Sequence, residues 1–153
     1  MYIRKKILFL LPLIFSLSVL SSDIEEIIVK GEYREKSLGE EDSSIVVIQS
    51  EQIKSQAIKH FQQLSHLVPN LNYAASDSRA RYFQIRGIGE RSGYQGTPNS
   101  SVGFLIDDID YSGQGGIATL FDVDQVEVFR GPQGSRSGAN ALAGLIYIKT
   151  KDP

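Results

Sequence analysis

Apolar and polar side chains alternate along three short stretches in the second half of the chain: residues 81–88, 125–130 and 145–150. Successive side chains of a strand point to opposite faces, so alternation over this length predicts half-buried β-strands. In the last stretch Ile146 and Ile148 share one face.

Further strands are predicted from apolar runs. Residues 44–48 read Ser-Ile-Val-Val-Ile, which is typical of a buried strand. Residues 102–106 and 109–111 flank Asp107-Asp108, and this arrangement predicts a hairpin with a two-residue turn.

Two small helices are predicted between these strands. Ser50 is a suitable N-cap for a polar helix over residues 51–57. In the second helix apolar residues recur at helical spacing, and Pro69-Asn70 ends the pattern. These apolar residues are Phe61, Leu64, Leu67 and Val68. The elements together predict an α+β fold: a mixed sheet of short strands, two small helices and long glycine-rich loops.

The first 22 residues have the three parts of a secretory signal peptide. Three basic residues and no acid precede an apolar run over residues 7–20, and two serines follow it. A transmembrane helix is the alternative, but the run is shorter than the roughly 20 apolar residues that a span needs, and it contains Pro12. We therefore expect export through the Sec pathway and a mature protein that begins near Asp23.

Charge divides the chain into three parts. The sequence has 16 Lys and Arg and 18 Asp and Glu: residues 1–22 carry +3, residues 23–42 carry eight acids against three bases, and residues 43–153 balance at ten against ten. This body lacks an obvious cluster of Lys and Arg, which argues against a nucleic-acid binder. The absence of Cys excludes disulfides and thiolate metal sites. We expect a signal peptide (1–22), an acidic flexible leader (23–42) and a folded domain (43–153).

The acidic leader contains one apolar segment, residues 24–31. Its β-branched residues Ile27, Ile28 and Val29 favour an extended conformation, and Gly31 ends the run. Such a segment suits strand addition to the sheet edge of a partner. It equally suits a first edge strand packed on its own domain, and spacing alone leaves both alternatives open.

Asp107, Asp108 and Asp110 are candidate ligands for a divalent cation, because carboxylate oxygens are hard ligands. Their spacing lacks the glycine and the distal glutamate of a calcium loop. Turn chemistry is therefore the favoured interpretation, and a metal-dependent hydrolase is the weaker one.

No other motif completes a catalytic site. The glycines at 87, 89 and 93 depart from the dinucleotide fingerprint, and residues 131–138 lack the Lys-Ser/Thr pair of a phosphate loop. His60 and His66 are six residues apart on a predicted helix, so they do not share a face. No serine has a recognisable His and acid partner. We expect a protein that is not an enzyme and that takes no cofactor or metal ion.

Several stretches together resemble the N-terminal part of a TonB-dependent outer-membrane receptor. The matching stretches are residues 24–31 (the TonB box), 44–70 (the opening strand and helix of the plug), 84–89 (Gln-Ile-Arg-Gly-Ile-Gly, a plug strand end) and 102–111 (the hairpin strand). The most specific block is residues 124–151, where VEV-x-RGPQG and then GxxALxGxIxIxT fix more than ten positions in register.

The resemblance implies the plug, or gate, of a receptor for energised uptake of a scarce nutrient such as an iron-siderophore complex. It implies a location in the outer membrane, where the plug sits inside the receptor's own 22-stranded barrel. The other implied partners are the periplasmic domain of TonB, with energy supplied through ExbB and ExbD, and a small-molecule ligand such as a metal chelate.

The resemblance also assigns roles to residues. The residues expected to pair with TonB are Ile24, Glu25, Glu26, Ile27, Ile28 and Val29. Arg86 and Arg130, at the ends of adjacent plug strands, are expected to lock the plug against carboxylates of the barrel wall, with Glu127 as an intra-plug partner of one of them. The residues expected to meet ligand from apical loops are Tyr94, Gln95 and Tyr111.

Three features depart from the family pattern. Asp108 stands where the hairpin turn usually has Gly, Arg136-Ser137 replaces Leu-Tyr, and the chain stops at Pro153, where the barrel would begin. We therefore expect a fragment or truncated form of a receptor. The alternative is a free-standing periplasmic ligand-binding or signalling module that uses the plug fold.

Overall fold

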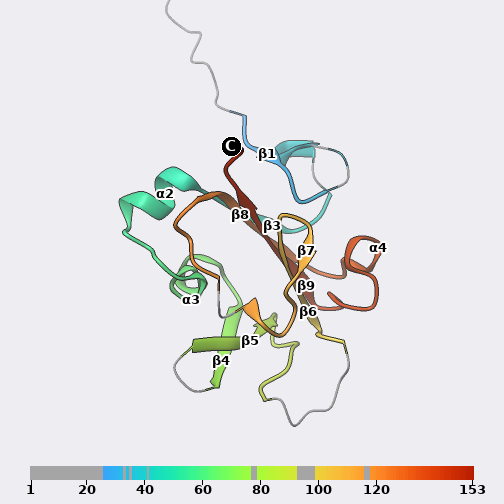
Figure 1. The fold of residues 1–153 in the computed structure, drawn as a ribbon. Helices are drawn as coiled ribbons and strands as arrows, with labels where there is room; N and C mark the ends of the chain where they lie inside the picture. Colours follow the sequence, from blue (N-terminus) through green and yellow to red (C-terminus); the bar gives the residue numbers. More distant parts are fainter. Residues whose placement is uncertain are drawn as a thin grey trace, which may run out of the picture.

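The computed structural model describes residues 26–32, 34, 36–40, 42–76, 79–92, 99–115 and 118–153. Figure 1 shows a central sheet with small helices and hairpins on both sides. The expected signal peptide, Ile24 and Glu25 at the start of the TonB box, and the loop residues Tyr94 and Gln95 lie outside the described residues.

A five-stranded mixed sheet forms the centre of the fold, with strand order β3-β8-β9-β6-β7. Its strands are β3 (Ile45–Gln49), β6 (Val102–Ile106), β7 (Ile109–Asp110), β8 (Val123–Arg130) and β9 (Gly144–Thr150). β6 and β9 run parallel, and the other neighbouring pairs are antiparallel. The predicted α+β class and mixed sheet are therefore confirmed, as are the expected strands and the hairpin around Asp107-Asp108.

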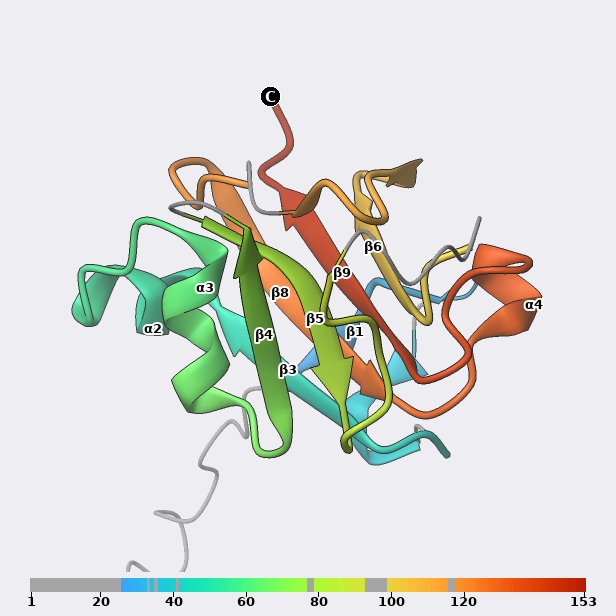
Figure 2. The same ribbon diagram turned by 90° about the horizontal axis from the view of Figure 1, so that it is seen from below.

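Two helices and a hairpin cover one face of this sheet. They are α2 (Ser50–Ser55), α3 (Phe61–Leu64) with the 3-10 turn η3 (Ser65–Leu67), and the antiparallel pair β4 (Leu71–Ser76) and β5 (Arg79–Ile85). In Figure 2 β4 and β5 lie in front of β8 and β9, with α2 and α3 beside them and β1 behind the sheet. The two predicted helices form, although Ser50 is the first residue of α2 and Gln49 is its N-cap.

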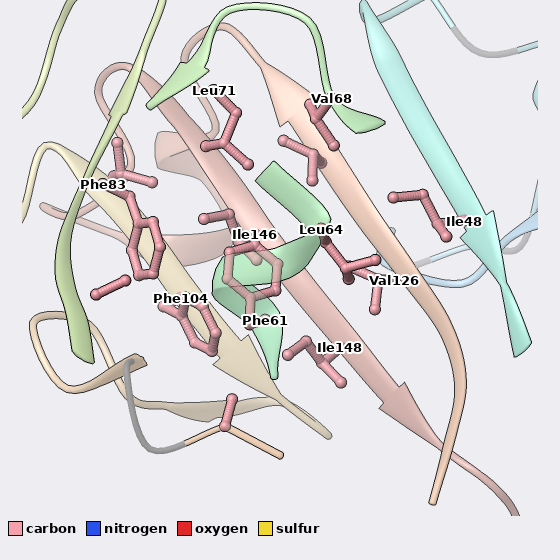
Figure 3. Packing of buried hydrophobic residues seen from close by; sticks show 14 of the residues in the cluster. Ile48, Phe61, Leu64, Val68, Leu71, Phe83, Phe104, Val126, Ile146 and Ile148 are labelled. Atoms are coloured by element: carbon pink, nitrogen blue, oxygen red, sulfur yellow. The ribbon is translucent and has the colours of Figure 1, made fainter. Parts of the chain in front are cut away.

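The main core lies between these elements and the sheet (Figure 3). Alternate residues of the central strands point into it, including Val126, Val128, Ile146 and Ile148. Phe61 contacts the rings of Phe83 and Phe104 edge to face, each at 5.2 Å between centroids. Aromatic pairs in this geometry add about 0.5–1.5 kcal/mol each beyond the area they bury.

The opposite face of the sheet carries a second cluster, made of Val29, Leu105, Phe129, Ala141, Leu145 and Tyr147. It is covered by β1 (Ile28–Val29), β2 (Lys36–Ser37), the 3-10 turn η2 (Leu38–Glu40) and the segment around α4 (Gly134–Ser137). The sheet is therefore the middle layer of three, and part of the acidic leader belongs to the third layer.

Among the described residues there is no helix with the length and apolar character needed to cross a membrane.

Candidate functional site: the leader segment against strand β8

Two polar side chains of β8, Gln125 and Glu127, point to the same face of the sheet as the second cluster, because residues two apart on a strand share a face. Both are buried, and Glu127 is 0 % exposed. In the register of the sheet Glu127 lies directly opposite Tyr147 of β9 and Val47 of β3. An acidic side chain at such a position requires donors that replace its hydration.

The donors come from the main chain of the leader. The Lys30 N–H donates to Glu127 Oε1 at 2.6 Å, and the Gly31 N–H donates to Glu127 Oε2 at 2.7 Å. Gln125 Nε2 also donates to Glu127 Oε1. One carboxylate is thereby bound to two consecutive amides that lie almost one hundred positions earlier in the chain.

Burial raises the pKa of Glu127 above its ordinary value of 4.5, because the ionised carboxylate loses its hydration. The hydrogen bonds from the leader and from Gln125, together with the charge of Arg136, act in the opposite direction without outweighing burial.

Apolar and ionic contacts hold the same segment. Val29 is 0 % exposed and packs into the second cluster. Lys30 Nζ lies 2.7 Å from Asp124 Oδ2. Gly fits at position 31 because the main chain lies close to the Phe129 ring. A Cβ at this position would lie 2.7 Å from Phe129 Cε2, which is shorter than a normal contact between carbon atoms. The end of the apolar run is thus fitted to the surface of β8.

Two short segments of the leader form a ribbon. Ile28–Val29 pairs with Lys36–Ser37 as a small antiparallel ribbon, and the ribbon packs on its own domain. This arrangement matches the alternative in which the segment packs on its own domain, and pairing with a partner stays a prediction.

The expected lock residues occupy different surroundings. Arg86 follows β5, is exposed, and has the left-handed backbone angle φ of 55°. Arg130 ends β8, and its buried Nε has no hydrogen-bond partner among the described residues. The two strands were expected to be adjacent, but β5 pairs with β4 in a separate two-stranded sheet. Glu127 was expected to pair with one of these arginines, and its carboxylate instead binds the leader.

The three aspartates of the hairpin point to different partners. Asp107 accepts hydrogen bonds from the Thr150 N–H and hydroxyl, Asp108 pairs with Arg136, and Asp110 accepts from Asn140 Nδ2. Asp107 and Asp108 have φ of 46° and 69°, the left-handed values that a two-residue hairpin turn requires. The described part of the chain holds no group of three or more His, Cys, Asp or Glu placed for a metal ion. The hydrogen bonds and backbone angles of these acids make them turn and anchoring residues.

Tyr111, expected in an apical loop, is half-buried against the main core, and its N–H donates to the Phe104 carbonyl at 2.8 Å.

Sequence reasoning missed Gln125, Asp124 and the role of Gly31 in this site. The sequence contained one signal. The acidic Glu127 shares a face of its strand with the apolar Phe129, and the opposite face of that strand is apolar. A carboxylate at such a position predicts buried donors, although not which segment supplies them.

Comparison with known proteins identifies the class. The family model described as the TonB-dependent Receptor Plug Domain matches residues 37–145. The chain therefore belongs to this family, as the motif block of residues 124–151 indicated.

Two curated proteins from Yersinia are similar in sequence to this chain. The pesticin receptor of Yersinia pestis is 27% identical over 146 residues, which cover 94% of this chain and 21% of that protein. The pesticin receptor of Yersinia enterocolitica is 29% identical over 111 residues, which cover 72% of this chain and 16% of that protein. The chain thus spans about a fifth of the length of the curated relatives, or less.

Solved structures share the fold. The ferric yersiniabactin uptake receptor FyuA from Yersinia pestis superposes with a TM-score of 0.61 at 28% identity, over 72% of this chain and 17% of that chain. The ferripyoverdine receptor of the outer membrane of Pseudomonas aeruginosa gives a TM-score of 0.67 at 18% identity, over 83% of this chain and 16% of that chain. The second likeness establishes the fold alone.

Proposed function

We propose that residues 43–153 act as the plug, or gate, of a TonB-dependent receptor in the outer membrane, reached by Sec export with residues 1–22 as the signal peptide. Membership of the plug family supports this role, since the plug is the part of such a receptor that residues 37–145 match.

The segment of residues 24–29 pairs as a strand with the periplasmic domain of TonB, which draws on ExbB and ExbD for energy. The observation that carries this proposal is β1: Ile28–Val29 is extended, precedes the plug, and belongs to a sheet of only two strands. An extended segment with so few strand neighbours suits strand addition.

The transported ligand is proposed to be an iron-siderophore complex. The similar solved structure of the ferric yersiniabactin uptake receptor FyuA, at 28% identity, supports this ligand class without selecting one member. Tyr94 and Gln95 are proposed to face the ligand.

Arg86 and Arg130 are proposed to face carboxylates of the surrounding barrel. Arg86 is exposed directly after β5, which supports a contact of its guanidinium with a surrounding wall. Glu127 belongs to the same region of β8 as Arg130, with its carboxylate bound to the leader.

Replacement of Ile28 by proline in the complete receptor tests the coupling role. Proline removes one strand donor, and Ile28 is 42 % exposed, so the change leaves the plug core intact. We expect uptake of radiolabelled ferric yersiniabactin, the chosen probe, to fall to the level of a host without TonB, while binding to cells is unchanged. Ile28→Val is the matched control and should transport normally.

Two results would contradict the proposal. Undiminished uptake by the Ile28→Pro receptor, with binding intact, would remove the coupling role from this segment. A native product that an antibody detects only as a small periplasmic protein would favour the free-standing module instead.

A further inference from the structure

Strand β1 has two edges, and β2 occupies one of them. Ile28 lies opposite Ser37 and Val29 opposite Lys36. The Leu38 N–H donates to the Ile27 carbonyl at 2.9 Å. This edge of the segment is therefore paired in the way of an ordinary antiparallel ribbon.

Side chains occupy the other edge. Gln125 Nε2 donates to the Ile28 carbonyl at 2.8 Å, and Glu127 Oε1 accepts from the Lys30 N–H at 2.6 Å. The carbonyl of one strand residue and the N–H two positions later point to the same side, where a neighbouring strand would supply one donor and one acceptor. Gln125 and Glu127 supply this donor and this acceptor.

The positions of these two side chains are fixed by burial and by a hydrogen bond between them. They stand two residues apart on β8, both are buried, and Gln125 Nε2 also donates to Glu127 Oε1. Glu127 Oε2 takes the next amide, that of Gly31, at 2.7 Å. The packing of Val29 at 0 % exposure keeps the segment in place against them.

We propose that Gln125 and Glu127 form a strand mimic that covers, and so masks, the outer edge of residues 28–31, at the C-terminal end of the TonB-pairing segment, and that these two side chains set how readily residues 28–31 leave β8 for strand addition. The inference rests on the proposed function for the identity of the partner. The mask itself is a property of this chain and can be measured without TonB.

Thiol labelling measures the release directly, because the natural chain has no Cys. In the full chain, a single cysteine is introduced as Val29→Cys, and its rate of reaction with a maleimide reports how often the segment opens. Adding Glu127→Gln should raise this rate roughly tenfold or more, since a charge-assisted acceptor for two amides is lost. Gln125→Ala should raise it by a smaller factor, about two- to tenfold, because only neutral donors are removed.

Two reference cysteines keep the result interpretable. Ile28→Cys, at a position 42 % exposed, should react rapidly in every background. Ile146→Cys, at a fully buried position of the main core, should stay unreactive in the Glu127→Gln background if the fold is intact. If Glu127→Gln proves unfolded, Gly31→Ala replaces it: the added Cβ cannot fit against Phe129, so the segment is displaced while Glu127 is retained.

An unchanged Val29→Cys labelling rate in folded Glu127→Gln and Gly31→Ala backgrounds would overturn the mask. A second measurement separates this failure from failure of the proposed function. Titration with the isolated periplasmic domain of TonB should show tighter binding to Glu127→Gln by about the same factor as labelling, because only the released fraction binds. Faster labelling with no TonB binding by any variant would leave the mask in place and remove TonB as the partner.

Discussion

Arg136 Nη2 donates to Asp108 Oδ1 at 2.5 Å, which joins α4 to the turn between β6 and β7. At these two positions the resemblance to the plug family led us to expect Gly and Leu. The Arg136 side chain is mostly buried, and its guanidinium lies 4.7 Å from the centre of the Tyr147 ring. The two departures are therefore partners in the structure.

A double-mutant cycle tests this pairing. Asp108→Gly alone relieves the left-handed backbone, with φ of 69°, but leaves the Arg136 guanidinium without this carboxylate. Arg136→Leu alone leaves the exposed Asp108 in a turn that glycine would suit better. We expect a coupling free energy of about 0.5–1 kcal/mol, limited by the exposure of Asp108, from urea unfolding of the two single variants and the double variant. Simple additivity of the two single changes would mean that the residues do not compensate each other.

Asp107, next to Asp108 in the same turn, makes the stability of the chain depend on pH in the acidic range. Partial burial acts to raise the pKa of Asp107, but the hydrogen bonds from Thr150 and the ammonium of Lys149 outweigh it and place the pKa below the ordinary value of 3.8. A lowered pKa means that this contribution to stability is complete above pH 3.8 and is lost as the pH falls through the lower folded-state value.

Asp107→Asn should therefore reduce the free energy of unfolding by roughly 1 kcal/mol near neutral pH, with the difference shrinking toward zero in strong acid. Urea unfolding at a series of pH values measures this. Asp122→Asn is the control: its carboxylate is 67 % exposed and 4.0 Å from Lys151 Nζ, so the change should stay within about 0.5 kcal/mol. A difference for Asp107→Asn that persists undiminished in strong acid would contradict the assigned ionisation.

Local pattern was sufficient for much of the fold. Strands β8 and β9 alternate over more than five residues, and the Asp107-Asp108 turn has residues that accept left-handed angles, so each was predictable from its own sequence. β4 was not predicted, because Leu71–Ser76 has little apolar alternation and forms by pairing with β5. Its existence depends on a neighbour rather than on its own residues.

The candidate site was predictable only in part. The apolar box was visible at residues 24–31, and the face to which Glu127 points followed from alternation. The contact between them joins positions separated by 96 and 97 residues, and no local rule specifies such a pairing. The assignment of Glu127 to an arginine was reasonable for an exposed strand, but a fully buried carboxylate takes whichever donors cover it, and here these are main-chain amides.

Because Glu127 is buried, its contribution to stability changes with pH in the opposite direction to that of Asp107. Burial raises its pKa above 4.5, so between pH 4.5 and the raised value the folded chain holds more proton than the unfolded chain. The contribution of this group to stability is complete below pH 4.5 and is lost as the pH rises through the folded-state value. The titratable side chains beside it are Arg136 from α4 and Tyr147, which lies opposite in the register of β9. Lys30 contributes its main-chain N–H, and its ammonium pairs with Asp124.

Glu127→Gln tests this contribution, because the variant keeps all the neighbouring groups, removes the ionisation of residue 127 and exchanges one acceptor oxygen for an amide group. The difference in unfolding free energy between the original chain and Glu127→Gln should move in favour of the variant as the pH rises above 4.5, with a constant offset for the altered hydrogen bonds. Urea unfolding across this range measures the slope. A difference that is flat, or that moves toward the original chain, would show that the hydrogen bonds from Lys30, Gly31 and Gln125 outweigh burial at this carboxylate.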